Sequence, residues 1–511
     1  MSDAIDSSQN TGLSPAEAVG LPPATPREIR RCIFGLMLVL ALASLDGNIV
    51  GPALPRIVSD LGGLSHLSWV VTAFAVASTA STPLYGKLSD QFGRRPAFFV
   101  SIGLFLLGSV FCGAAGSMPA LIVSRAVQGV GAGGLMTLSQ TTIADLVSPR
   151  ERGRYQGAIA GVFALCSVAG PLVGGLITDM LSWPWIFYIN LPIGAAALAI
   201  LSVSLRPHVG RPSRGVDWLG FGLLIGATCT WLLLLSWGGV VYPWLSAPVL
   251  GLAALTVVMV GVLVPVEHRA AEPAVPPHLF HDRVFTVGVA VVTLSTAALF
   301  GALVFIPLFF QVVLGASATE AGLRMAPMMG GLIISAVLGG RMVTKTGRYK
   351  LYPVVGLAAA SGVFVAMAWA ARAGASANAF DGLLVALGLG IGLIMPNMTT
   401  AVQNAVAPSD IGIATATLGF FRSLGGALGV AVSGAILAAT LHARIPAGQG
   451  GVVNAGLTEL RDLPAALRAE VLGAYGHALS ATFATAAVVS LLAFALVVFL
   501  PDRKLRDAPH R

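Results

Sequence analysis

Long apolar runs recur along this chain of 511 residues, and they limit its fold more than any other feature. The run from Phe34 to Leu54 is one example, and Asp46 is the only charged residue within it. Because the hydrocarbon core of a bilayer is about 30 Å thick, a helix needs about 20 such residues to cross it. The runs are continuous rather than alternating, so they predict spanning helices instead of a β-barrel.

Composition argues against a soluble protein. Hydrophobic residues make up 56% of the chain and charged residues only 10%, and the mean hydropathy is +0.85. A soluble surface of this size would carry far more charge. The four cysteines lie in or beside apolar runs without metal-ligand spacing, so they indicate small buried side chains rather than disulfides or ligands.

We predict an all-α polytopic membrane protein with fourteen spanning helices. Their expected limits are 32–54, 69–88, 97–116, 119–144, 154–179, 185–205, 217–238, 244–266, 284–313, 320–343, 351–371, 380–402, 411–440 and 478–500. The outer loop before the last span contains an amphipathic stretch, 463–475, which we expect to form a separate interfacial helix.

Basic residues orient these spans. If the N-terminus lies in the cytoplasm, 22 of the 30 Lys and Arg residues fall in inside segments and five in outside segments. This asymmetry follows the positive-inside rule and places both termini in the cytoplasm. The polar stretch Met1–Pro26 lacks the pattern of a cleavable signal and is expected to be disordered. We therefore expect a multi-pass protein of the cytoplasmic (inner) membrane.

A repeated loop divides the chain into two halves. GKLSDQFGRRP (Gly86–Pro96) recurs 254 residues later as GRMVTKTGRYK (Gly340–Lys350), and both copies fall on the cytoplasmic side. Recurrence on the same side indicates two parallel repeats. The predicted organisation is a disordered segment 1–31, a six-helix bundle 32–206, an inserted helix pair 207–283, a second bundle 284–500 and a tail 501–511.

The first copy of the loop is a candidate conformational latch. Asp90 can accept hydrogen bonds from helix N-terminal amides or from an Arg of the same loop. The second copy has Thr344 where the first has Asp90, so the latch should be asymmetric. The residues assigned to it are Gly86, Asp90, Gly93, Arg94 and Arg95.

Five stretches resemble a known family. GKLSDQFGRRP resembles the loop signature of the major facilitator superfamily. Four other stretches resemble motifs of the fourteen-span drug:proton antiporters within this superfamily. They are LDGNIVGPALP (45–55), SRAVQGVGAGG (124–134), GAIAGVFALCSVAGPLVGG (157–175) and SWPWIFYINLPIG (182–194). The chain departs from the family at Asn48, Gly51, Pro52 and Pro184. The resemblance implies two six-helix bundles plus two inserted helices. It also implies an antiporter motif at Gly161, Gly170, Pro171, Gly174 and Gly175, which would pack the fifth span tightly and prevent a proton leak.

Asp46 and Arg125 are the candidate proton-coupling residues. Asp46 is the only carboxylate well inside a predicted span, where a charge costs about 2.5–3.5 kcal/mol and usually marks function. It lies about 12 Å, and Arg125 about 9 Å, from the outer ends of their spans at 1.5 Å per residue. The two are therefore expected at similar depth, and the resemblance implies proton transfer for Arg125. A permanently paired Asp and a packing Arg that snorkels outward remain the structural alternatives.

Three further polar residues are candidates for the substrate cavity: Asn48, Gln128 and Arg422. Gln128, one turn after Arg125, could also extend the polar network of that residue. Arg422 lies about 17 Å into its span. It could counter an anionic group of the substrate or bond to facing carbonyls. The spans hold few acids, so we do not expect strong selectivity for dications.

The sequence contains no catalytic constellation, so we do not expect an enzyme. No GxxxxGK[ST] loop and no Cys/His metal set is present. We expect no cofactor, no metal and no nucleic-acid partner. The remaining energy source is a proton gradient, with one proton worth about 2.3 kcal/mol per 100 mV. The prediction is a monomeric proton-coupled exporter of lipophilic drugs or toxic compounds, cationic ones among them. The alternatives are export of a metabolite, amino acid or lipid by the same mechanism, and a membrane sensor that does not transport.

Overall fold

The structure is a computed structural model that describes residues 25–62, 67–205, 217–239, 241–270, 273–316, 318–444, 464–503 and 505. The expected disorder of the N-terminal segment up to residue 24 lies outside these residues. So do the predicted tail beyond residue 505 and the outer loop at 445–463.

Helices make up almost all of the described secondary structure. Their bounds are α3 Pro26–Leu61, α4 Leu67–Phe92, α5 Arg94–Gly113, α6 Met118–Leu146, α7 Pro149–Met180, α8 Trp185–Tyr188, α9 Asn190–Ser204, α10 Trp218–Trp237, α11 Ala247–Arg269, η3 Pro277–His281, α12 Arg283–Leu303, α13 Ile306–Leu308, η4 Phe309–Val313, α14 Ala318–Leu323, α15 Ala326–Thr346, α16 Leu351–Ala373, α17 Ala377–Gly392, α18 Met395–Ala405, η5 Pro408–Asp410, α19 Ile411–Arg444 and α22 Ala465–Val498.

The fold has the fourteen spans that the apolar runs predict. Thirteen helical segments of the described chain are long and apolar enough to cross a bilayer. Helix α4 completes the set, since its 26 residues correspond to about 39 Å and pack along α6 and α19. Its hydroxyl side chains, among them Thr79 and Thr82, lower its hydropathy. The amphipathic stretch 463–475 is an exception, because its described residues form the first turns of α22 and not a separate interfacial helix.

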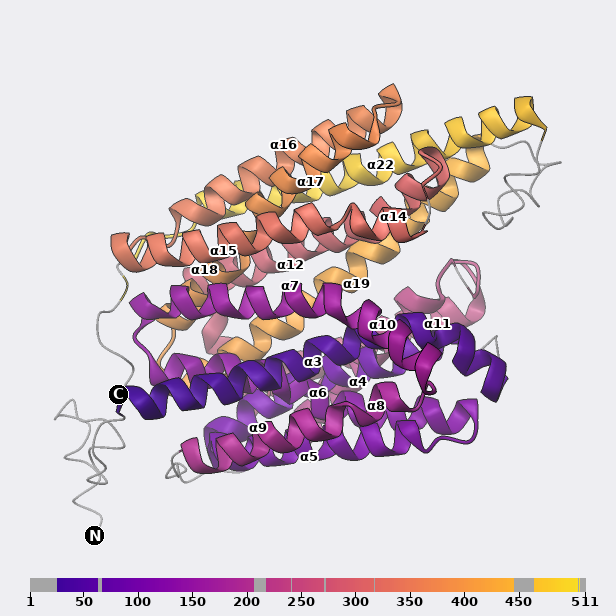
Figure 1. The fold of residues 1–511 in the computed structure, drawn as a ribbon. Coiled ribbons are helices and arrows are strands. Elements are labelled where there is room, and N and C mark those ends of the chain that lie inside the picture. The colour runs from indigo at the N-terminus through magenta and orange to yellow at the C-terminus, as the bar shows by residue number, and fades with distance from the viewer. Residues whose placement is uncertain are drawn as a thin grey trace, which may run out of the picture.

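Two helical bundles lie side by side (Figure 1). Helices α3–α9 form the first bundle and α12–α22 the second, and each buries its own apolar core. In the inserted pair, α10 packs on α4 and α19 at the edge of the boundary between the bundles, and α11 packs on α10.

Two helix pairs pack tightly across the boundary between the bundles, which we call the seam. Helix α4 packs on α19, and α7 packs on α15. A Cβ atom added to Gly86 would stand 2.9 Å from the carbonyl oxygen of Gly412, and one added to Gly157 would stand 2.9 Å from the Cα atom of Val337. Since both distances are shorter than real Cβ contacts, these two positions require glycine.

The two ends of the bundles differ, and we name them by one residue each. The Asp90 end holds the α4–α5 connector, the start of α3 and the end of α22. The segment after α22 contacts the second bundle at this end, where Arg503 forms an ion pair with Asp282 at 2.7 Å. The opposite His442 end holds the end of α19 and the α10–α11 connector.

Candidate functional site

A buried ion pair lies inside the first bundle. Arg125 on α6 donates through Nη1 to the Oδ2 atom of Asp46 on α3 at 2.7 Å. The Asp46 side chain is 0% exposed and that of Arg125 is 2% exposed. The structure thus joins two residues that are 79 positions apart in sequence and that the sequence places at similar depth.

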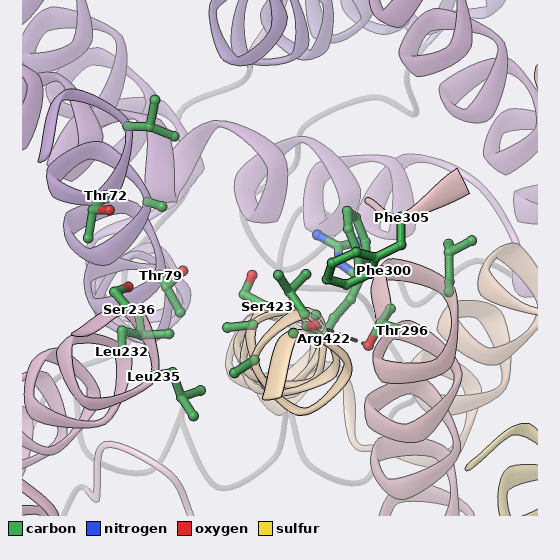
Figure 2. Close-up of a pocket in the computed structure, with 18 of the residues that line it drawn as sticks. Thr72, Thr79, Leu232, Leu235, Ser236, Thr296, Phe300, Phe305, Arg422 and Ser423 are labelled. Carbon is green, nitrogen blue, oxygen red and sulfur yellow. Dashed lines mark hydrogen bonds between the residues drawn. The ribbon is translucent and has the colours of Figure 1, made fainter. Parts of the chain in front are cut away.

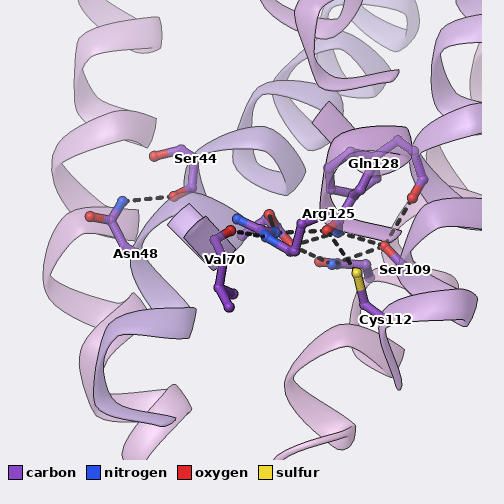
Figure 3. A network of polar contacts seen from close by, with 10 residues as sticks. Ser44, Asn48, Val70, Ser109, Cys112, Arg125 and Gln128 are labelled. Atoms are coloured by element: carbon purple, nitrogen blue, oxygen red, sulfur yellow. Dashed lines mark hydrogen bonds and ion pairs between the residues drawn. The ribbon is translucent and has the colours of Figure 1, made fainter. Parts of the chain in front are cut away.

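Two amide side chains complete the environment of the carboxylate. Gln128 donates through Nε2 to the Oδ1 atom of Asp46 at 2.7 Å, and Asn190 donates through Nδ2 to the same atom at 2.9 Å. Gln128 also accepts from Arg125 at 2.7 Å and donates to Ser109 at 2.8 Å. Figure 3 shows Arg125, Gln128 and Ser109 converging in this network. All three described partners of Asp46 are donors, so the arrangement matches a carboxylate.

Asn190 was not singled out from the sequence. It is the first residue of α9, is fully buried, and leaves its Oδ1 atom without a hydrogen-bond partner. The available signal was an amide in an otherwise apolar span, within the stretch SWPWIFYINLPIG. A polar side chain in such a place is costly unless it bonds to another polar group.

Aromatic rings and a carbonyl hold the guanidinium of Arg125. Its Nε atom donates to the carbonyl oxygen of Val70 at 3.2 Å. Its Cζ atom lies 4.1 Å from the ring centroid of Phe74 and 5.8 Å from that of Phe187. A buried pair is tolerated only when geometry and added hydrogen bonds offset the loss of water, and this site provides both.

Asn48 lies on the other side of α3. Its Nδ2 atom donates to the carbonyl oxygen of Ser44 at 2.7 Å. A Cβ atom added to Gly170 on α7 would stand 2.6 Å from the Cβ atom of Asn48. Asn48 therefore faces α7, away from the ion pair.

The four glycines of the predicted antiporter motif on α7 fall into two groups. Gly170 and Gly174 face α3, where a Cβ atom would collide with Asn48 or with the carbonyl oxygen of Ile49. A Cβ atom on Gly161 or Gly175 would meet open space. Pro171 lies inside the helix between the two crowded positions. Only Gly170 and Gly174 of this motif are thus required for the close contact of α7 with α3.

A second polar site closes the seam at the Asp90 end. The Nη1 atom of Arg94 lies 2.6 Å from the Oδ1 atom of Asp90, and its Nε atom lies 2.8 Å from the Oδ2 atom of Asp145. The second oxygen of Asp90 accepts from the backbone amide of Ile413 at 2.9 Å. Ile413 belongs to the first turn of α19, whose free amides attract a negative charge. Asp90 thereby links the two bundles.

The remaining residues of this connector support its shape. Gly93 has a φ of 92° at the start of α5, a conformation that favours glycine. The Cζ atom of Arg95 lies 6.0 Å from the ring centroid of Phe99. In the second half, Thr344 donates to the carbonyl oxygen of Gly340 in its own helix at 2.9 Å. The two copies therefore differ in structure as well as in sequence.

A cavity of about 1790 Å³ lies between the bundles. Its lining runs from Gln140 and Gln156, nearer the Asp90 end, to Trp244 and His442 at the opposite end, where both are exposed. The cavity thus reaches the surface at the His442 end and is closed at the Asp90 end by α4 and α19. Neither Asn48 nor Gln128 is among its described lining residues, and neither is Asp46.

Arg422 of α19 does line this cavity. Figure 2 shows it with Ser423 between a wall bearing Thr79 and Leu235 and a wall bearing Thr296, Phe300 and Phe305. Its Nη2 atom lies 2.7 Å from the Sδ atom of Met136. Within the described ranges, no group of His, Cys, Asp and Glu side chains is arranged to hold a metal ion.

Comparison with known families gives one match that covers most of the chain. The family model described as Major Facilitator Superfamily matches residues 36–217 and 218–430. The two matched segments together cover more than three quarters of the sequence.

Relatives and solved structures agree with this match. The Multidrug transporter protein MdtP of Bacillus subtilis is 38% identical over 405 residues, which cover 79% of this chain and 74% of MdtP. Multidrug resistance protein 3 of the same organism is 31% identical over 93% of this chain and 95% of its own. The structure of the proton:xylose symporter XylE matches with a TM-score of 0.64 at 14% identity, over 94% of this chain and 98% of XylE. The last similarity concerns the fold alone.

Proposed function

This chain belongs to the major facilitator superfamily, and we propose that it exports small molecules in exchange for protons by alternating access. The cargo is a lipophilic drug or toxic compound. Two relatives whose names describe multidrug transport support this choice, at 38% and 31% identity. The two bundles rock against each other around the central cavity.

The observation that carries the proposal is the buried pair of Asp46 and Arg125. A carboxylate inside a membrane bundle costs about 2.5–3.5 kcal/mol and is typical of proton relays. In the proposed cycle, α3 and α6 shift relative to each other within the first bundle when the two bundles rock, so that Asp46 separates from Arg125. A water-filled path then supplies a proton to Asp46. When the pair forms again, the positive charge of Arg125 displaces that proton.

We place the Asp90 end in the cytoplasm, because most basic residues of the chain lie in segments at that end. The described conformation is then closed toward the cytoplasm and open outward. Asp90 acts as the latch of this state through Arg94 and Ile413. Gly170 and Gly174 keep α7 close to α3 and so prevent a proton leak past the pair.

The test is efflux from energised cells that lack their own multidrug pumps. A panel of fluorescent dyes and drugs is screened, and each exported compound is then compared between wild type and Asp46→Asn. Asp60→Asn on the same helix is the matched control, because its amide oxygen can still accept from Trp183. We expect a protonophore or Asp46→Asn to abolish efflux and Asp60→Asn to preserve it. Efflux that survives both treatments would refute proton coupling through Asp46.

A further inference from the structure

The central cavity carries positive charge without a matching acid. Among its described lining residues, Arg422 and His442 are the only ionisable side chains, and no Asp or Glu contributes. His442 is exposed near the end of α19, whereas Arg422 lies in its first half, about 17 Å from its start. The inner part of the cavity therefore offers one fixed cation, since a guanidinium stays protonated in proteins.

The charge of Arg422 is poorly compensated. The hydrogen bond that the structure gives its guanidinium ends on Met136, whose thioether is a weak and uncharged acceptor. None of the described carboxylates forms an ion pair with Arg422. This differs from Arg125, Arg94 and Arg324, each of which pairs with at least one acid. Arg422 is half-buried, and a partly desolvated cation without a counter-charge is unfavourable, so an anionic ligand would stabilise it.

A second polar side chain, Gln156 of α7, lines the same cavity. It lies about 10 Å from the start of α7, nearer the Asp90 end than Arg422 is. It is 4% exposed and its Nε2 atom is fully buried, so it does not offer a donor to a ligand in this conformation. The cavity therefore offers one unpaired cation and no described acid, which suits a ligand with acceptor oxygens.

Most of the remaining lining is apolar. Phe300 is 41% exposed and lines one wall with Phe305, and Leu235 lines the facing wall. The volume of about 1790 Å³ exceeds the range of about 300–1000 Å³ that is typical of drug-sized sites. The cavity can therefore hold a molecule with a large hydrophobic body beside its polar end.

We infer that the cargo is an amphipathic organic anion. Its carboxylate, sulfonate or phosphate head binds the guanidinium of Arg422, and its hydrophobic body packs against the aromatic wall of α12. This inference rests on the proposed export function and narrows its cargo. A lipophilic cation would meet repulsion at Arg422 and would find no described acid to offset it.

Binding of three probes with one hydrophobic body tests the charge preference. The probes are 1-pyrenebutyrate, 1-pyrenebutanol and 4-(1-pyrenyl)butyl-trimethylammonium. The full chain is placed in phosphatidylcholine nanodiscs at pH 7 without any gradient, and energy transfer from tryptophan to pyrene is measured against empty nanodiscs. We expect the carboxylate to bind at least about 10-fold more tightly than the ammonium.

The matched variants are Arg422→Gln, Arg422→Lys and, at an exposed helix end, Arg372→Gln. Arg422→Gln should weaken the binding of pyrenebutyrate by about 10- to 100-fold, since the charge-assisted hydrogen bond is lost. The affinity for pyrenebutanol, which lacks the charge, should stay within about twofold of the wild-type value. Arg422→Lys should restore most of the affinity, and Arg372→Gln should change nothing. Retained binding of pyrenebutanol shows that the Gln variant is folded.

Two results would overturn the inference. One is tighter or equal binding of the ammonium probe by the wild type. The other is an equal loss of binding of all three probes in the Arg422→Gln variant, which would indicate a structural role for Arg422. Because binding is measured at equilibrium, neither result depends on proton coupling. If efflux from cells still depends on Asp46 while the three probes bind equally well, the proposed export function stands. Only the inference that the cargo is an anion is then wrong.

Discussion

The carboxylate of Asp90 on α4 accepts a hydrogen bond at 2.9 Å from the backbone amide of Ile413, in the first turn of α19. This bond crosses from one bundle to the other at the end where the cavity is closed. Arg94 contacts the other oxygen of this carboxylate at 2.6 Å, and Asp145 in turn contacts Arg94 at 2.8 Å. The closed end is therefore held by a specific charge-assisted contact in addition to apolar packing.

Removing this carboxylate should open the Asp90 end. Asp90→Ala loses the bond to Ile413 and the pair with Arg94, which together contribute about 1–3 kcal/mol. We expect the population with separated bundles to rise at least about fivefold. Spin labels on Phe92→Cys and Ala407→Cys, both at exposed positions of this end, report the distance by pulsed electron resonance. An unchanged distance distribution would show that Asp90 does not hold the closed state.

Gly86→Ala should also open the Asp90 end, in this case for a steric reason. Its new Cβ atom would collide with Ala416 and stand 2.9 Å from the carbonyl oxygen of Gly412, and overpacking of this kind costs about 1–3 kcal/mol. The same spin-label pair should show a larger open fraction. Gly103→Ala is the control, since its Cβ atom meets no atom within 4 Å. Equal effects of the two substitutions would exclude a role for the α4–α19 contact.

Two neighbouring glycines of α7 should respond in opposite ways to alanine. Gly174→Ala places a Cβ atom against the carbonyl oxygen of Ile49 and should lower the Tm. Gly175→Ala meets open space and should raise the Tm slightly, because alanine favours the helix by about 1 kcal/mol. Tryptophan fluorescence during heating in one detergent compares the two. A similar loss in both variants would mean that the spacing of this motif is not set by α3.

A double-mutant cycle should reveal the coupling of Asp46 to Arg125. Either Asp46→Asn or Arg125→Gln leaves a buried charge unpaired, which costs about 3–5 kcal/mol for a pair of this kind. The double variant removes both charges and should lose less stability than the sum of the single variants. The Tm of the four proteins measures the cycle. Additive losses would show that the two side chains do not stabilise each other.

Asn190→Ala should alter proton coupling more than stability of the fold. The substitution removes one of three donors to Asp46 and leaves Arg125 and Gln128 in place. We expect the rate of efflux to fall about fivefold, because the Asp46 side chain loses one of the hydrogen bonds that position it. Efflux rates under one fixed proton gradient measure the loss, with Asn48→Ala as the control on the far side of α3. An unchanged rate would assign Asn190 to packing alone.

The sequence predicted the helices well because each span is a local pattern of composition. The fourteen apolar runs, the repeated loop and the position of Asp46 all follow from residues close together in the chain. Counting residues from the outer ends of their spans also predicted that Arg125 and Asp46 lie at similar depth. This count requires only that both spans cross the same membrane in known directions. These inferences need no knowledge of how the helices pack laterally.

Lateral packing is the part that the sequence could not provide. Nothing local indicates that Asp90 meets Ile413, because 323 residues separate them. Asn190 could have been noticed as an amide in an apolar span, but its partner depends on where α9 rests against α3. Gln128 was expected both in the cavity and in the polar network of Arg125. The structure places it in the network, bonded to Arg125 and Asp46 inside the first bundle.

Helix α10 supplies Leu232, Leu235 and Ser236 to the cavity, although it belongs to neither bundle. Its Trp237 packs edge-on against Trp69 of α4, with ring centroids 5.6 Å apart. Mutations on this wall reshape the chamber without touching Asp46, Arg125 or the Asp90 contact. Natural selection can therefore change what such a protein recognises by varying α10, while the buried ion pair and the contact that closes the opposite end stay as they are.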